Sequence, residues 1–370
     1  MKFKKVSLYG EDFKFVNTDV CVENGVFSDS SENGEIDCDG LMMLPGLVDV
    51  HTHGAVGCES IDGNFEAVEK ISKFEAEHGT TAFLPTFSTQ SNAELLASAR
   101  CIADAKPRVT GAKIGGIHME GPYFSMKYKG AQNPANIRLP SADEFFEINE
   151  ASGGLVRLVS IAPENEGAEE FVKAVKNSVK VGAGHTDADY ETMVKAIDWG
   201  VTQLTHTYNA MRGLHHRNPG AIGAAIDDGR VFCELISDGM HVHPAMVRTL
   251  YKAVGAERLV LISDSVRPAY LPDGEYDSCG LKVFVKNGKA TLEDGTIAGS
   301  SSTLFDCMKK AVEFGLPVED AVRAATYNPA KAVGIDNEYG VIKTGRAADF
   351  ILVDKELNLK AVYIDGKKIK

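Results

Sequence analysis

From residue 44 onwards the chain alternates short apolar runs with amphipathic helical stretches, and this alternation limits the possible folds more than any other feature. Helical stretches separate most of the runs. The eight apolar runs lie at residues 44–50, 81–85, 112–118, 156–161, 180–184, 203–206, 232–236 and 259–263. Strands that alternate with helices form a parallel sheet, and eight of them close into a barrel of the TIM type. We therefore expect an α/β fold whose main domain is a (β/α)8 barrel.

Both ends of the chain are rich in β-like runs and flank the predicted barrel. Residues 1–43 alternate such runs with turn signals, among them Asn24-Gly25 and Asn33-Gly34. Similar runs return at 340–343, 350–353 and 361–364. We expect residues 1–45 and 336–370 to form one small β-sandwich domain and residues 46–335 to form the barrel. A hairpin at 281–292 and two helices at 301–314 and 318–326 should follow the eighth strand.

Composition excludes several classes of partner. The formal net charge is −13 at pH 7 and the basic residues are scattered, so we expect neither nucleic acid nor a membrane surface as a partner. A small anionic ligand is compatible with this composition, because a pocket can be locally basic in a protein whose net charge is negative. No run approaches the roughly 20 apolar residues that span a bilayer. The seven cysteines are far apart, with no C-x-x-C pair, which is typical of reduced thiols in a cytoplasmic protein.

Polar residues that could bind a metal or take part in catalysis follow six of the predicted strands. The ends of parallel barrel strands converge on one mouth, where catalytic residues of this fold lie. The residues concerned are His51 and His53 after the first strand, Glu120 after the third, His185 after the fifth, His206 after the sixth, Asp238 and His241 after the seventh, and Asp264 after the eighth.

A metal site accounts for most of these residues together. His51 and His53 are two positions apart, so they point to the same face of a strand. Imidazole and carboxylate are ligands that zinc-like ions prefer. A lone H-x-H is often structural, but buried Glu120, His185 and His206 would each need a separate explanation in a core. One metal explains them together.

Two aspartates and one loop leave alternatives open. Asp264 follows an apolar run, and a carboxylate there is either a rim residue binding backbone amides or a general base. Asp49 suits a structural role, and Asp238 suits either. The loop His215–Gly220 (HHRNPG) is either a solvated turn or an anion-binding loop, because the Arg217 guanidinium matches phosphate oxygens.

Several motifs together resemble one family. Residues 45–54 (PGLVDVHTHG) and 340–349 (GVIKTGRAAD) are similar to the opening and closing segments of the amidohydrolase superfamily. Within it, residues 118–122 (HMEGP), 184–186 (GHT), 206–211 (HTYNAM) and 298–301 (AGSS) resemble the N-acetylglucosamine-6-phosphate deacetylases. The resemblance spans essentially the whole chain. It implies a cytoplasmic, homodimeric hydrolase that releases acetate from N-acetylglucosamine 6-phosphate in amino-sugar catabolism.

The resemblance also implies roles for individual residues. Glu120, His185 and His206 would hold the principal divalent metal, Zn or Fe, and Asp264 would act as acid and base. His51 and His53 would allow a second metal. His241 resembles a residue that reaches the substrate of the neighbouring subunit. The substrate-binding residues implied are Ala131, Gln132, Asn209, Ala210, Arg217, His241, Ile297, Ala298 and Gly299. Gln132 replaces a histidine that in many members is thought to polarise the amide carbonyl.

Other functions remain compatible with the sequence. One is deacetylation of N-acetylgalactosamine 6-phosphate, and another is hydrolysis of a cyclic amide, as in dihydroorotases. No lysine at a strand end offers the carboxylated bridge of the latter. A catalytically silent sugar-phosphate sensor is the alternative outside enzymology. Asp264 argues against it, since binding alone needs no buried base.

Overall fold

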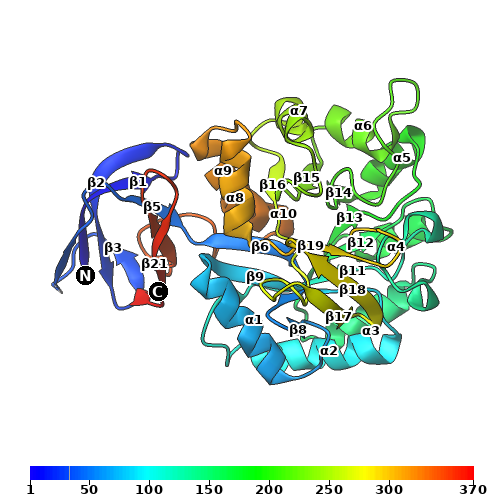
Figure 1. The fold of residues 1–370 in the computed structure, drawn as a ribbon, viewed down its shortest axis with the longest axis horizontal. Helices are drawn as coiled ribbons and strands as arrows, with labels where there is room; N and C mark the ends of the chain where they lie inside the picture. The colour runs from blue at the N-terminus through cyan, green and yellow to red at the C-terminus, as the bar shows by residue number, and fades with distance from the viewer. Residues whose placement is uncertain (33) are drawn as a thin grey trace.

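The computed structural model describes residues 1–32 and 34–370 and contains a barrel beside a separate β sheet (Figure 1). Eight parallel strands form the barrel in chain order. They are β6 (Leu47–Thr52), β9 (Thr80–Phe87), β11 (Ile117–Glu120), β12 (Val156–Ile161), β13 (Lys180–Ala183), β14 (Val201–Leu204), β15 (Phe232–Leu235) and β16 (Leu259–Leu261). The short strand β10 (Lys113–Ile114) also pairs with β9. The expected (β/α)8 barrel is confirmed.

The first and last barrel strands meet just beyond their carboxyl ends. The amide of Asp264 donates to the carbonyl of His51 over 2.8 Å, and the amide of His53 donates to the carbonyl of Ser265 over 2.8 Å. Closure therefore occurs at the mouth, and it places Asp264 beside His51 and His53.

Helices surround the barrel and turn one face to it. Several begin at a polar cap: Ser91 and Thr303 each accept from a main-chain amide and form capping boxes with Glu94 and Asp306. The helices are α1 (Phe65–Glu77), α2 (Asn92–Ala105), α3 (Ala142–Ala151), α4 (Ala168–Val175), α5 (Tyr190–Trp199), α6 (Gly220–Asp227), α7 (Pro244–Val254), α8 (Leu304–Glu313), α9 (Val318–Ala325) and α10 (Tyr327–Val333), with 3-10 turns η1 (Met126–Tyr128) and η2 (Pro134–Asn136). Strands covered by helices on one face and side chains on the other are continuously buried, as β9 is throughout.

The two ends of the chain share one sheet, as the sequence predicts. The strand β5 (Met42–Pro45) joins them, because it pairs with β1 on one side and with β20 on the other. The other members are β1 (Lys2–Tyr9), β2 (Phe15–Glu23), β3 (Val26–Ser28), β4 (Glu35–Asp37), β20 (Phe350–Val353), β21 (Leu359–Ile364) and β22 (Lys367–Lys368). Phe350 stacks on Tyr363 and contacts Phe3 edge-on, so this sheet has a core of its own.

Some predicted elements differ from the structure. The apolar run at 44–50 splits at Gly46: its first part belongs to the terminal sheet and the rest to the barrel. A Cβ at Gly46 would lie 1.9 Å from Oγ1 of Thr81, so only glycine fits this passage. The strand expected at 340–343 is wrong, because these residues form a bend followed by irregular backbone. The predicted turn at Asn33-Gly34 includes Asn33, which lies outside the described residues.

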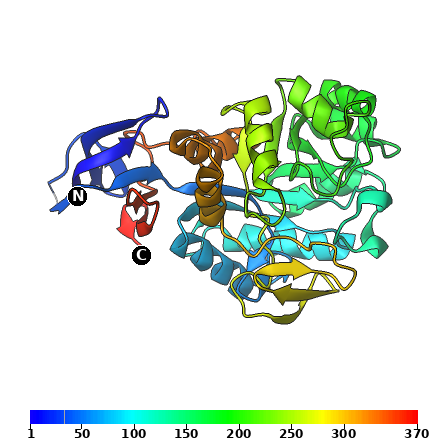
Figure 2. The same cartoon turned by 45° about the horizontal axis from the view of Figure 1, so that its top comes forward.

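The predicted hairpin after the eighth strand is a three-stranded sheet. Its members are β17 (Gly274–Ser278), β18 (Leu281–Lys286) and β19 (Lys289–Thr291), and Figure 2 shows it in yellow outside the barrel strands. A smaller pair, β7 (Gly54–Ala55) and β8 (Cys58–Glu59), follows the first barrel strand. These insertions build up the wall of the mouth, because residues from both line the cavity described below.

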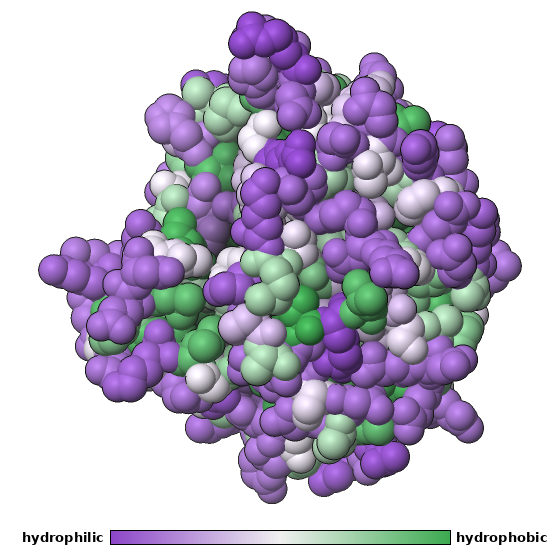
Figure 3. All heavy atoms as spheres, turned by 90° about the vertical axis from the view of Figure 1, so that its right-hand side faces the viewer, coloured by the Kyte–Doolittle hydropathy of each residue, from purple (hydrophilic) through white to green (hydrophobic). Residues whose placement is uncertain are grey.

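Hydrophilic side chains cover most of the face seen in Figure 3, and apolar ones occur there in small groups. Among the described residues, no helix combines the length and the apolar character that crossing a bilayer requires.

Candidate metal centre

The predicted ligands meet at the mouth of the barrel. His51 lies within β6 and Glu120 ends β11, while His185, His206 and Asp264 follow β13, β14 and β16 by two or three residues. All of these residues are buried, as is His53, and none of them is more than 8% exposed. His185, His206 and Asp264 have φ of 46°, 28° and 48°. Such left-handed backbone is costly for side chains other than glycine and is concentrated at functional sites.

Glu120 lies at the centre of the cluster. Its Oε1 is 3.2 Å from Nε2 of His185 and 3.0 Å from Nε2 of His206. Its Oε2 is 3.3 Å from Nε2 of His53, while Nε2 of His51 lies 3.4 Å from Oε1. Glu120 therefore belongs to two groups of potential ligands, one with His185 and His206 and one with His51 and His53.

The donor atoms fit a divalent cation. Nδ1 of His185 lies 3.0 Å from the carbonyl oxygen of Tyr128, which only accepts, so Nδ1 carries the proton and Nε2 presents a lone pair. This Nε2 lies 3.1 Å from Nε2 of His206. In the second group, Nε2 of His51 is buried and makes no hydrogen bond. Electron-rich atoms that converge in this way suit a metal with imidazole and carboxylate ligands.

The charges in the cluster compensate one another. Burial opposes protonation of His51, but the carboxylates of Glu120, Glu234 and Asp264 outweigh it and hold the pKa of His51 well above its usual value. Burial likewise opposes ionisation of Glu120 and Asp264, yet His51 and its neighbours keep the pKa of each carboxyl below its usual range. The carboxylates are therefore ionised, and a divalent cation would bind in place of the histidine protons that balance their charge.

Further side chains hold the ligands in place. Gln132 donates from Nε2 to Oε2 of Glu120 over 2.5 Å, and its Oε1 accepts from the amide of Thr89 over 2.8 Å. Nδ1 of His53 lies 3.0 Å from Oγ of Ser88. Such contacts fix the orientation of ligand side chains before an ion arrives.

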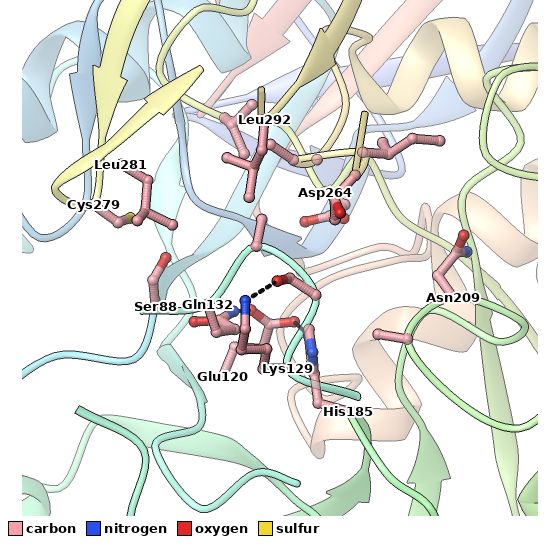
Figure 4. Close-up of a pocket in the computed structure, with 18 of the residues that line it drawn as sticks. Ser88, Glu120, Lys129, Gln132, His185, Asn209, Asp264, Cys279, Leu281 and Leu292 are labelled. Atoms are coloured by element: carbon pink, nitrogen blue, oxygen red, sulfur yellow. Dashed lines mark hydrogen bonds and ion pairs between the residues drawn. The ribbon is translucent and has the colours of Figure 1, made fainter. Parts of the chain in front are cut away.

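A cavity of about 520 Å³ opens onto these groups, a size that suits a small organic ligand. Figure 4 shows Asp264 across the cavity from Glu120 and His185. All but one of the predicted substrate-binding residues line it, namely Ala131, Gln132, Asn209, Ala210, His241, Ile297, Ala298 and Gly299.

The remaining residue, Arg217, is exposed and is not among the described residues that line the cavity. Its Nη1 lies 2.8 Å from Nε2 of His216. His241 lines the cavity of its own chain and is held by Asp238, whose Oδ2 is 2.7 Å from Nδ1 of His241.

Sequence reasoning missed several residues at this site. Lys129, Glu59, Ser88 and Cys279 also line the cavity. Glu234 reaches His51 from within β15. Glu234 could have been identified, because it interrupts an apolar run just as Asp264 follows one. Glu59 ends the two-residue strand β8 and the others lie outside helices and strands, so no periodic pattern marks any of them.

Comparisons with known proteins agree with this geometry. Residues 42–369 match the amidohydrolase family. The chain is 34% identical to N-acetylglucosamine-6-phosphate deacetylase of Vibrio furnissii, over 94% of this chain and 89% of that protein. It is also 34% identical to N-acetylgalactosamine-6-phosphate deacetylase of Escherichia coli O157:H7, over 89% and 88% of the two chains.

Solved structures extend the likeness to the fold. The crystal structure of N-acetyl-D-glucosamine-6-phosphate deacetylase from Mycobacterium smegmatis superposes with a TM-score of 0.93 at 31% identity and covers 100% of both chains. A variant of that protein in complex with N-acetyl-D-glucosamine 6-phosphate gives a TM-score of 0.92 at 31% identity, covering 100% of this chain and 98% of the other.

Proposed function

The chain belongs to the amidohydrolase family, and from this we propose that it hydrolyses N-acetyl-D-glucosamine 6-phosphate to D-glucosamine 6-phosphate and acetate. The observation that carries the proposal is the ionised Asp264 facing the ligand groups of Glu120 at the base of a cavity. The likeness to deacetylases over nearly the whole chain supports the choice of reaction.

The metal would be held by Glu120, His185 and His206, with His51 and His53 able to hold a second ion beside it. We propose Zn or Fe, in one or two copies per chain, because imidazole and carboxylate ligands suit both. When bound, such an ion supplies Lewis acidity, which polarises a carbonyl and makes water a stronger nucleophile near neutral pH.

Asp264 provides the proton transfers. Its Oδ1 lies 3.3 Å from Nε2 of His53 and 3.5 Å from Nε2 of His51, and its low pKa keeps it in the basic form. The carboxylate accepts a proton from the attacking water as the water oxygen bonds to the acetyl carbon. The C–N bond then breaks, and Asp264 returns the proton to the departing nitrogen, so that acetate and the free amine leave.

Gln132 is placed to contact the acetyl group. Its Oε1 is engaged by Thr89 and one N–H by Glu120, which leaves the second N–H of the amide available. We assign this N–H to the acetyl carbonyl oxygen. A carboxamide cannot transfer a proton, so its contribution is a hydrogen bond alone.

The wider cavity suits the rest of the amino sugar. Asn209, Ala210 and His241 offer polar and main-chain groups, and the ammonium of Lys129 offers positive charge to a phosphate. The proposal includes a homodimer in the cytoplasm. The seven unpaired cysteines support a reducing compartment.

The decisive experiment measures acetate release after the metal-free protein is loaded with Zn or Fe. We expect turnover of N-acetylglucosamine 6-phosphate to exceed that of its galactose epimer, with metal content measured in the same sample. The E. coli relative makes the epimer the second candidate, and a faster reaction with it would reverse the assignment. No acetate from either sugar would leave the silent-sensor alternative standing, together with hydrolysis of a different amide.

A further inference from the structure

Glu234 is a buried carboxylate that the proposed reaction does not use. It lies in β15 between Cys233 and Leu235, and its exposure is 0%. Within the described part of the chain, His51 is the only basic side chain within ion-pair distance of it. Its Oε1 is buried and makes no hydrogen bond. Burying a carboxylate with only one ion-pair partner costs free energy of folding. The contact between Glu234 and His51 therefore needs an explanation.

That contact determines which ring nitrogen of His51 carries the proton. Oε2 of Glu234 lies 3.1 Å from Nδ1 of His51. The carboxylate only accepts, so Nδ1 must carry the proton, and in the neutral ring Nε2 then presents its lone pair. This Nε2 faces Oε1 of Glu120 at 3.4 Å and Oδ1 of Asp264 at 3.5 Å. The hydroxyl of Ser88 beside Nδ1 of His53 can donate or accept, and therefore imposes no such choice.

The same carboxylate oxygen also reaches the first ligand group. It accepts from the amide of His206 over 3.2 Å, and the carbonyl of Glu234 accepts from the amide of Thr207 over 2.8 Å. His206 has left-handed backbone, which surrounding contacts must maintain. Glu234 thus contacts both ligand groups, one through a ring nitrogen and the other through the main chain.

We propose that Glu234 is a positioning residue that presents His51 to a divalent cation through Nε2 and couples this ligand to the strand end carrying His206. The inference rests on the metal centre of the proposed function and is independent of which sugar is the substrate. A carboxylate behind a ligand histidine both orients the ring and raises its basicity, and its loss typically lowers metal affinity about 10- to 100-fold.

The test titrates the metal-free full-length protein with Zn²⁺ alone, in competition with a chelating dye. Glu234→Gln keeps the shape and an acceptor but removes the charge, whereas Glu234→Met removes both. We expect Zn²⁺ affinity to fall about 10-fold in the first variant and towards 100-fold in the second. Should Glu234→Met fail to fold, Glu234→Gln decides alone.

Glu75→Gln is the matched control. Glu75 is a similarly buried carboxylate on helix α1, and it accepts from the hydroxyl of Thr52 rather than contacting a ligand histidine. The same substitution there should leave Zn²⁺ affinity as in the native chain. Circular dichroism and thermal unfolding of the metal-free variants separate a loss of folding from a loss of binding.

A double-mutant cycle with His51→Asn tests the route of the effect. If Glu234 acts through His51, most of the loss caused by Glu234→Gln should disappear in the His51→Asn background. An equal loss in both backgrounds, or native affinity in both Glu234 variants, would overturn the proposal. Failure of the native chain to bind Zn²⁺ would instead contradict the metal centre itself, so the two failures are distinguishable.

Discussion

The side-chain amide of Gln132 donates to Oε2 of Glu120 over 2.5 Å and thereby leaves Oε1 of Glu120 to His185 and His206. Because Gln132 is itself anchored by the amide of Thr89, the carboxylate cannot rotate freely. One neutral side chain thus supports the central residue of both ligand groups.

Gln132→Leu should therefore weaken the centre while the fold persists. Loss of the donor frees Glu120 to turn, and we expect a fall of about 10- to 100-fold in Zn²⁺ affinity or in kcat. Metal analysis after dialysis and steady-state kinetics measure the two effects. Asn133→Ala is the control, because Asn133 lies in the same loop and only caps Ala135. Native values for Gln132→Leu would show that Glu120 needs no such support.

Asp264→Asn should abolish turnover and leave metal content normal. Asparagine has nearly the same shape but cannot accept the proton of water, and general acid–base catalysis contributes roughly 10²- to 10⁴-fold. Acetate release and metal analysis on the same preparation provide the check. A variant that retains most of the native kcat would remove Asp264 from this role.

Lys129→Met should raise KM for phosphorylated substrates specifically. The half-buried Lys129 lines the cavity, its ammonium bonds to the carbonyl of Gly130 at 3.3 Å, and among the described residues no carboxylate lies within 4.0 Å of it. A charged hydrogen bond is worth about 1.5–3 kcal/mol, so kcat/KM should fall about 10- to 100-fold.

Two comparisons check this prediction about Lys129. Activity on unphosphorylated N-acetylglucosamine should not change in Lys129→Met. Lys127→Met should behave as the native chain, since Lys127 is already paired with Asp187 at 3.0 Å. Equal losses on both sugars would place Lys129 away from the phosphate.

Glu75→Gln should stabilise the protein increasingly as pH rises. Burial, with the charge of Asp49 adding to it, raises the pKa of Glu75 to about 8 although Thr52 donates a hydrogen bond to it. A carboxyl whose pKa rises on folding holds its proton more tightly in the folded chain than in the unfolded chain. The folded state therefore loses stability as the pH rises between the two pKa values. For Glu75 this loss grows from about pH 4 up to pH 8.

Thermal unfolding from pH 5 to pH 8 measures this effect. The melting temperature of Glu75→Gln minus that of the native chain should increase across the range, because glutamine carries no such charge. A constant difference between the two proteins would show that Glu75 titrates normally. Glu77→Gln in the same helix provides a second reference, since the side chain of Glu77 is exposed to solvent.

The barrel and its ligands could be predicted because their signals are local. Runs such as 259–262 are apolar throughout, since a strand covered on both faces has no side to expose. Histidines and acids at the ends of such runs must then converge, because all eight ends open on one mouth. In the structure, ligand atoms of His185, His206 and Glu120 do converge there.

Other features had no local signal. The run at 44–50 contains both a strand of the terminal sheet and the start of a barrel strand, and only the packing of Gly46 against Thr81 divides it. Residues 340–343 look like a strand but form a bend and irregular backbone. The distance of Arg217 from the cavity depends on the course of a loop, and loops follow their tertiary contacts more than their composition.

The amino-acid pattern was thus sufficient for the barrel, its mouth and the type of ligands gathered there. How those ligands are held depends on the tertiary structure and could not be predicted from the sequence. Glu234 meets His51 across 183 positions, and Gln132 meets Glu120 through a loop anchored on Thr89. Periodicity records which face of an element is buried, whereas these contacts depend on side-chain directions and loop conformations that are set when distant strands come together.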